Sequence, residues 1–79
     1  MYKRILSAVN EHLNSEITAR YALHLARACG ARLYLCFVAD KGMSGSDIGK
    51  AEDSMKRLFS EARDMDMQAE SISTTGWPL

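Results

Sequence analysis

The sequence predicts an α/β fold in which short strands alternate with two longer helices. Two observations predict it. Short apolar runs alternate along the chain with two stretches in which apolar residues recur every three or four positions. Strands separated in this way by helices are typical of a parallel sheet, because parallel neighbours need a crossover connection.

The first expected strand covers residues 4–9, which are apolar on both faces and precede polar turn residues. The helix after it is expected to start at Asn14 or Ser15, since either side chain can cap a helix, and to stop at Gly30, a typical left-handed C-cap. Its apolar face is expected to comprise Ile17, Tyr21, Ala22, Leu25, Ala28 and Cys29. Its solvent-exposed surface is expected to carry Glu16, Arg20, His24 and Arg27.

The rest of the chain repeats this alternation. Residues 33–39 form an apolar run that predicts a strand buried on both faces, and residues 40–47 predict a flexible glycine-containing surface loop. A second helix is expected over about 47–65, and a more polar edge strand over 67–74. The seam of the second helix is expected to comprise Ile48, Ala51, Met55, Leu58, Ala62 and Met65.

The expected architecture is therefore β-α-β-α-β, half of a doubly wound, Rossmann-like parallel sheet. Right-handed crossovers give the strand order 3-2-1 with both helices on one face. The strand at 4–9 is apolar on both faces, as a central strand would be, yet this order leaves it at an edge of the sheet.

Composition excludes several classes of protein. The chain has 79 residues and 8.8 kDa, with 10 basic and 10 acidic side chains, so we expect one small domain that is not a nucleic-acid binder. No apolar run is long enough to cross a membrane, and no secretion signal is evident. Cys29 and Cys36 lack metal-ligand spacing and are expected to be buried thiols of a reducing cytoplasm.

Catalysis has little support in the sequence. His12 is expected in an exposed loop without a nucleophile at a recognisable spacing, and Ser44 and Ser46 belong to no nucleophile elbow. We therefore expect no enzyme, no catalytic residue and no metal site.

Several segments together resemble the opening half of universal stress proteins. They are Tyr-Lys-Arg-Ile-Leu-Ser-Ala-Val-Asn at 2–10, Asn-Ser-Glu at 14–16, residues 21–27, 30–33 and 35–40, and the turn Gly-Trp-Pro at 76–78. The resemblance implies a doubly wound sheet with strand order 3-2-1-4-5. The family's full domain is nearly twice as long, so residues 1–79 are expected to form a single universal-stress-protein-like domain truncated after the third strand.

The resemblance also implies a ligand, ATP or another adenine nucleotide, bound by Asn10, Glu11 and Val38. Ligands of open parallel sheets bind beyond the carboxyl ends of the strands, where all three residues lie. The family usually has Asp at the position of Asn10, and Asn10 could equally be a turn residue that bonds its own backbone. The family's phosphate-binding glycine motif has no counterpart, since Gly42, Gly45 and Gly49 lie in another connection with another spacing.

Two functions follow from these expectations. The first is a cytoplasmic, non-enzymatic, nucleotide-responsive or regulatory module of the stress response. The alternative is an interaction module without ATP that forms a homodimer or pairs with another chain through strand 4–9. An ATP pyrophosphatase is excluded at its defining site, because residues 10–15 lack the Ser-Gly-Gly-x-Asp-Ser loop.

Overall fold

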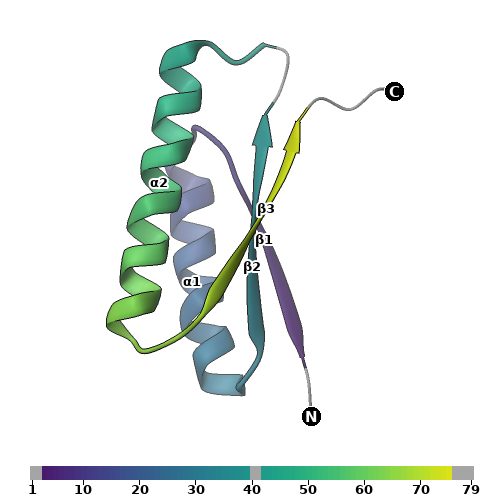
Figure 1. Ribbon diagram of the computed structural model, residues 1–79, viewed down its shortest axis with the longest axis vertical. Helices are drawn as coiled ribbons and strands as arrows, with labels where there is room; N and C mark the ends of the chain where they lie inside the picture. Colours follow the sequence, from purple (N-terminus) through teal and green to yellow (C-terminus); the bar gives the residue numbers. More distant parts are fainter. Residues whose placement is uncertain (1–2, 40–41, 76–79) are drawn as a thin grey trace.

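The computed structural model describes residues 3–39 and 42–75, and its elements alternate as expected. They are β1 (Arg4–Val9), α1 (Leu13–Cys29), β2 (Arg32–Ala39), α2 (Gly45–Asp64) and β3 (Ala69–Thr75). The strands are parallel and lie in the order β1-β2-β3, which is the predicted order 3-2-1 counted from the other edge (Figure 1). The predicted fold class is confirmed.

The central strand of the sheet is β2, and β1 and β3 are its edges. Ile5 of β1 lies opposite Leu33 of β2, which in turn lies opposite Ala69 of β3. Both helices lie on the same side of the sheet (Figure 1), as two right-handed crossovers in one direction require. The hydrophobic core therefore forms a single layer between the helices and one face of the sheet.

That core is built from alternate residues of the strands and from one side of each helix. Its largest fully buried side chains are Val9, Leu23, Leu33, Leu35 and Leu58. Alternate strand residues point to opposite faces, so the intervening positions form the face that no helix covers. Leu6 of β1 and Ile72 of β3 are large apolar side chains exposed on that face.

The helix α1 packs with a different side than the sequence pattern predicts. Ile17, Tyr21 and Leu25 are exposed, as are Ala28 and Cys29, so among the predicted apolar face only Ala22 is buried. The buried side instead comprises Glu16, Ala19, Ala22, Leu23 and Ala26. The prediction was wrong because small alanines, which let a helix approach a sheet closely, form the contact in place of the larger side chains.

The helix α2 follows its predicted seam more closely. Ala51, Leu58 and Ala62 are buried, and Ile48, Met55 and Met65 are half-buried. The helix begins at Gly45, earlier than expected, because Ser44 and Asp47 form a capping box. The predicted loop over 40–47 is therefore wrong at its C-terminal end, and its residues 40 and 41 lie outside the described part of the chain.

The helix termini and cysteines complete the comparison with the sequence. Gly30 adopts the predicted left-handed C-cap with φ of 68°. Neither Asn14 nor Ser15 caps α1, because the N-cap position falls at His12. Cys36 is half-buried but Cys29 is exposed, so the expectation of two buried thiols was wrong for Cys29. The predicted turn at 76–78 lies outside the described residues.

Candidate functional site

The structure brings the predicted nucleotide-binding residues to one end of the sheet. Asn10 directly follows β1, and Val38 lies one residue beyond the last paired position, Val9 opposite Phe37. Because β1 and β2 are parallel neighbours, their carboxyl ends share this edge. Glu11 follows Asn10 in the loop that leads into α1.

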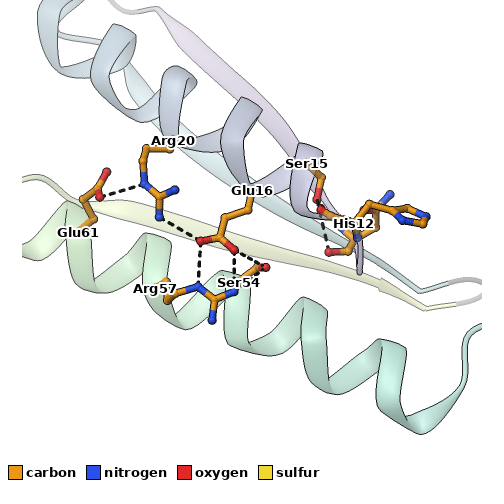
Figure 2. A network of polar contacts seen from close by, with 8 residues as sticks. His12, Ser15, Glu16, Arg20, Ser54, Arg57 and Glu61 are labelled. Carbon is orange, nitrogen blue, oxygen red and sulfur yellow. Dashed lines mark hydrogen bonds and ion pairs between the residues drawn. The ribbon is translucent and has the colours of Figure 1, made fainter.

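The side chain of Asn10 is engaged within its own loop. Its Oδ1 accepts a hydrogen bond of 2.8 Å from the backbone N–H of His12, the arrangement of an Asx turn. The backbone N–H of Asn10 donates to the Ser15 hydroxyl at 3.0 Å, and that hydroxyl donates to the His12 carbonyl at 2.8 Å (Figure 2). The turn interpretation of Asn10 is therefore confirmed, and the turn uses neither its amide N–H groups nor the second lone pair of Oδ1.

Glu11 and His12 lie side by side in this loop, with the Glu11 side chain half-buried and the His12 side chain exposed. The Nε2 atom of His12 is 3.6 Å from Oε1 of Glu11, and the imidazole is 74% exposed. The backbone of His12 is extended, and α1 begins at the next residue without a side-chain cap. The loop thus offers a carboxylate, an amide and an imidazole, which can bind polar groups.

The most heavily buried polar group of the described chain is Glu16, which the sequence pattern placed in solvent. Only 3% of Glu16 is exposed, and its carboxylate faces α2 (Figure 2). Oε1 accepts from Arg57 Nη2 at 2.7 Å and from the Ser54 hydroxyl at 2.8 Å, while Oε2 accepts from Arg57 Nε at 2.9 Å and Arg20 Nη2 at 3.0 Å. Both oxygens are therefore satisfied by charged or hydroxyl donors.

This environment strongly favours the ionised carboxylate. Hydrogen bonds from Arg57, and then from Ser54 and Arg20, lower the pKa of Glu16 from 4.5 to about 2, although burial opposes the shift. The network joins α1 to α2 and leaves neither oxygen available for a substrate. It is a structural clamp between the helices, and we call these four residues the Glu16 clamp.

The clamp continues outward to Glu61 of α2. Arg20 Nε donates to Glu61 Oε1 at 3.0 Å, and His24 Nε2 lies 3.3 Å from Glu61 Oε2. That second oxygen is buried and makes no hydrogen bond within the described structure, so its contact with His24 is an ion pair only when the imidazole is protonated. The signal in the sequence was the spacing of Glu16 and Arg20, four residues apart on a helix, which favours an ion pair.

A second exposed feature is the edge of β1 that pairs with no strand among the described residues, called here the free edge of β1. The backbone N–H of Arg32 donates to the Lys3 carbonyl at 2.8 Å. Since hydrogen bonding alternates along a parallel strand, Ile5, Ser7 and Val9 face β2, and the residues between them direct their N–H and C=O groups away from the sheet. Those outward residues are Arg4, Leu6 and Ala8, and Leu6 is 65% exposed.

A shallow hollow lies on the face of the sheet that no helix covers. The side chains of Arg4 and Leu6 line it together with Tyr34 and Ile72. The hollow is largely apolar and lies across all three strands. The free edge of β1 and the uncovered face are thus continuous.

These features define the class of protein as a parallel α/β domain built like half of a doubly wound sheet. The loop that joins β1 to α1 lies at the carboxyl ends of β1 and β2. The model of the universal stress protein family matches residues 1–73, and the chain belongs to this family. Comparison with curated proteins and with solved structures gave no match.

Over residues 3–39 and 42–75, no group of three or more His, Cys, Asp or Glu side chains is arranged to hold a metal ion. In the same part of the chain, neither helix has the length and apolar character that a membrane span requires.

Proposed function

We propose that this chain is a non-enzymatic regulatory module of the stress response that acts by association through the free edge of β1. The observation that carries the proposal is the row of outward backbone groups at Arg4, Leu6 and Ala8 on an apolar strand. Such a row is a template for another strand, and globular proteins usually protect it. The partner strand comes from a second copy or from another chain.

The contrast between the two edges of the sheet supports β1 as the associating edge. The sequence of β3, Ala-Glu-Ser-Ile-Ser-Thr-Thr, is polar and contains Glu70, which suits an edge in contact with water. The sequence of β1 is Arg-Ile-Leu-Ser-Ala-Val and resembles a strand with neighbours on both sides. Pairing along β1 would satisfy backbone groups next to Leu6.

The chemistry of the carboxyl-end loop supports a role other than catalysis. Asn10 and Ser15 are bonded within the loop, and the exposed His12 has Glu11 beside it. General acid–base catalysis needs a group positioned against a nucleophile or substrate. The Asn10 and Ser15 side chains instead close the turn, and the exposed imidazole of His12 lies beside a carboxylate rather than a nucleophile. A cytoplasmic location is proposed on the free thiols of Cys29 and Cys36, which suit a reducing compartment.

A proline in β1 provides the test. In Leu6→Pro the outward N–H is removed, while the hydrogen bonds from β1 to β2 remain, because edge strands tolerate proline where the N–H faces solvent. Leu6→Ala is the matched control, since it removes the same side chain but keeps the N–H group. Sedimentation velocity is measured for the native chain and both variants over a range of concentrations.

We expect the native chain and Leu6→Ala to associate as concentration rises and Leu6→Pro to remain monomeric. The circular dichroism of Leu6→Pro must match that of the native chain. A native chain that is monomeric up to roughly 1 mM, where only about 4 kcal/mol of binding free energy is needed, would overturn the proposal. Equal association of all three proteins would overturn it as well.

A second candidate function is adenine-nucleotide binding, favoured by the position of Asn10, Glu11 and Val38 at one edge of the sheet. Gly45 and Gly49 lie within α2 and do not form a glycine-rich loop of the spacing that the family's phosphate motif has. We therefore propose that the adenosine part supplies the affinity. Calorimetric titration with ATP, AMP and adenosine should then give similar affinities, reduced in Asn10→Ala. Absence of heat at millimolar ligand, or unchanged affinity in Asn10→Ala, would remove this candidate.

A further inference from the structure

We propose that the outer edge of β3 binds an extended segment of another protein as an added strand. Two alternate apolar side chains of that segment enter pockets beside α2, and a basic residue stands between them. The proposal goes beyond the association through β1, because it concerns the other edge of the sheet and a different partner. Recognition of this kind, in which main-chain hydrogen bonds extend a sheet and alternate side chains fill pockets, recurs among peptide-binding proteins.

The outer position of β3 is a property of the topology. β3 pairs with β2 on one side, and its other edge pairs with no strand in the described part of the chain. In the order 3-2-1-4-5 that the family resemblance implies, further strands join beside β1 and leave β3 outermost. A right-handed connection from β3 back toward β1 passes over the face opposite the helices. The outer edge of β3 and its helix-side surface are therefore accessible in the larger sheet too.

The helix-side surface of β3 is left open by α2. Ala69 and Ser71 lie opposite Leu33 and Leu35 of β2, so they belong to the row of residues that faces the helices. Leu33 and Leu35 are fully buried, whereas Ala69 is half-buried and Ser71 is exposed. The reason is that α2 packs against β2 and β1. Small side chains on β3 thus lie beside an uncovered flank of α2.

Two open pockets follow one another along this flank. The Ala69 pocket has a volume of about 340 Å³, and the Ser71 pocket has a volume of about 380 Å³. Phe59 of α2 lines both of them. The other apolar lining residues are Ala62 and Met67 in the Ala69 pocket, and Phe37 and Met55 in the Ser71 pocket. Both pockets can therefore bind apolar groups.

The spacing of the two pockets matches that of alternate side chains on a strand. Ala69 and Ser71 are two residues apart, which is roughly 6.7 Å along a strand. A strand added about 4.8 Å outside β3 has the same repeat, and every second side chain points to the helix side. Side chains such as Leu or Ile would there cover Met55 and Phe59, which are half-buried in the free chain. The pockets therefore favour the pattern apolar-x-apolar.

Charge identifies the residue between the two apolar ones. It points to the face opposite the helices, as Glu70 does between Ala69 and Ser71. Glu70 is exposed, and opposite charges on directly opposed strand residues attract. On the helix side the rim has mixed charge, from Glu52, Lys56 and Arg63 of α2. Glu70 therefore favours a segment of the pattern apolar-basic-apolar.

A short synthetic peptide tests the proposal. The probe is fluorescein-labelled Ser-Thr-Leu-Lys-Leu-Thr-Ser with blocked ends, titrated with the native chain and followed by fluorescence anisotropy. We expect a dissociation constant on the order of 0.1 to 1 mM, because few side chains are buried and the peptide must be ordered. Replacing both Leu by Ser should weaken binding at least about tenfold. Absence of binding at about 5 mM protein would overturn the proposal.

The main-chain contribution is tested with a peptide that is N-methylated at its three central residues. This peptide keeps every side chain but loses the N–H donors that pair with a strand edge. We expect its affinity to fall at least about tenfold. Equal affinity for the methylated and unmethylated peptides would overturn strand addition.

A protein variant locates the binding edge. Ser71→Ile places a side chain of the chain's own in the Ser71 pocket and should weaken peptide binding at least about tenfold without lowering the thermal stability. Ala8→Ile is the matched control, because it adds the same side chain at an exposed position of the other edge strand, and should keep the affinity within about twofold. Native affinity in Ser71→Ile would overturn the proposal, as would loss of binding in Ala8→Ile alone.

Charge reversal tests the basic residue. Glu70→Lys should weaken binding of the Leu-Lys-Leu peptide by about fivefold and strengthen binding of the corresponding Leu-Glu-Leu peptide by a similar factor. Thermal unfolding of Glu70→Lys confirms that the variant is folded. An unchanged preference between the two peptides would overturn the apolar-basic-apolar pattern.

Discussion

The helices α1 and α2 cover the same face of the same sheet but pack in different ways. In α2 the larger apolar residues Met55 and Leu58 turn toward the sheet, as their spacing predicts. In α1 most of the larger apolar residues point outward, and alanines together with Leu23 pack against the sheet. Apolar periodicity therefore shows where an apolar face of a helix lies, but not which surface that face packs against.

The cause lies in a buried charge and in side-chain size. Glu16 occupies the inner side of α1 because Arg57 and Ser54 of α2 satisfy its carboxylate there. Once Glu16 faces α2, the helical geometry turns Leu25 away from it. The alanines that remain on the inner side bring α1 close to the sheet.

Truncating one leucine in each helix is the strongest test of this contrast. Leu58→Ala in α2 removes a side chain that is 1% exposed and should cost about 3 kcal/mol of unfolding free energy. Leu13→Ala in α1, where the side chain is 67% exposed, should cost less than about 0.5 kcal/mol. Urea unfolding of dilute, monomeric protein measures both. Similar losses would mean that the two helices pack alike.

The pH dependence of stability tests the Glu16 clamp. The pKa of Glu16 is about 2 in the folded chain against 4.5 without partners, so its contribution is complete above pH 4.5 and is lost as the pH falls toward 2. The shift corresponds to about 3 kcal/mol. Glu16→Gln should remove this acid sensitivity, whereas Glu52→Gln, on the exposed side of α2, should retain it. Parallel pH profiles for Glu16→Gln and the native chain would show that the clamp contributes nothing.

Enlarging an alanine on each side of α1 probes how closely it approaches the sheet. Ala26 is fully buried, so Ala26→Leu should destabilise the fold by about 2 kcal/mol through overpacking. Ala28→Leu adds the same atoms on the exposed side and should change stability by less than about 0.5 kcal/mol. Thermal unfolding monitored by circular dichroism separates the two variants. A neutral Ala26→Leu would show space between α1 and the sheet.

The starts of the two helices give the smallest expected difference. Ser44 accepts from the Asp47 N–H at 3.1 Å, and Asp47 accepts from the Ser44 N–H at 3.2 Å, which lowers the pKa of Asp47. Ser44→Ala should cost about 1 kcal/mol. His12 provides no side-chain cap for α1, so His12→Ala should cost nothing measurable and His12→Ser should add a few tenths of a kcal/mol. Equal losses in Ser44→Ala and His12→Ala would contradict this difference.

The sequence predicted those features that depend on local pattern. Strand β1, the C-cap at Gly30 and the polar edge strand β3 follow from runs and residue types within a few positions. The strand order follows from crossover handedness, which holds for nearly all parallel connections. Each of these features depends on residues a few positions apart in the sequence or on the handedness of crossover connections.

Features that depend on distant side chains could not be predicted in this way. Glu16 and Arg57 are separated by 41 residues, and a carboxylate one helical turn before Arg20 is expected at the surface until its distant partners are placed. The start of α1 was misjudged because Ser15 bonds the loop rather than capping the helix. For Asn10 two interpretations were open, and the turn is identified by the hydrogen bond from the His12 N–H.

The central position of β2 has a consequence for how the chain folds. β2 contacts every other element, whereas β1 and β3 make no ladder with each other. Each edge strand can therefore pair only after β2 is extended, and we expect a folding nucleus in which β2 is ordered with one helix and one neighbour. Opening of β3 leaves the β1-α1-β2 unit paired, so the amides of β3 should exchange with solvent through a smaller opening than those of β2.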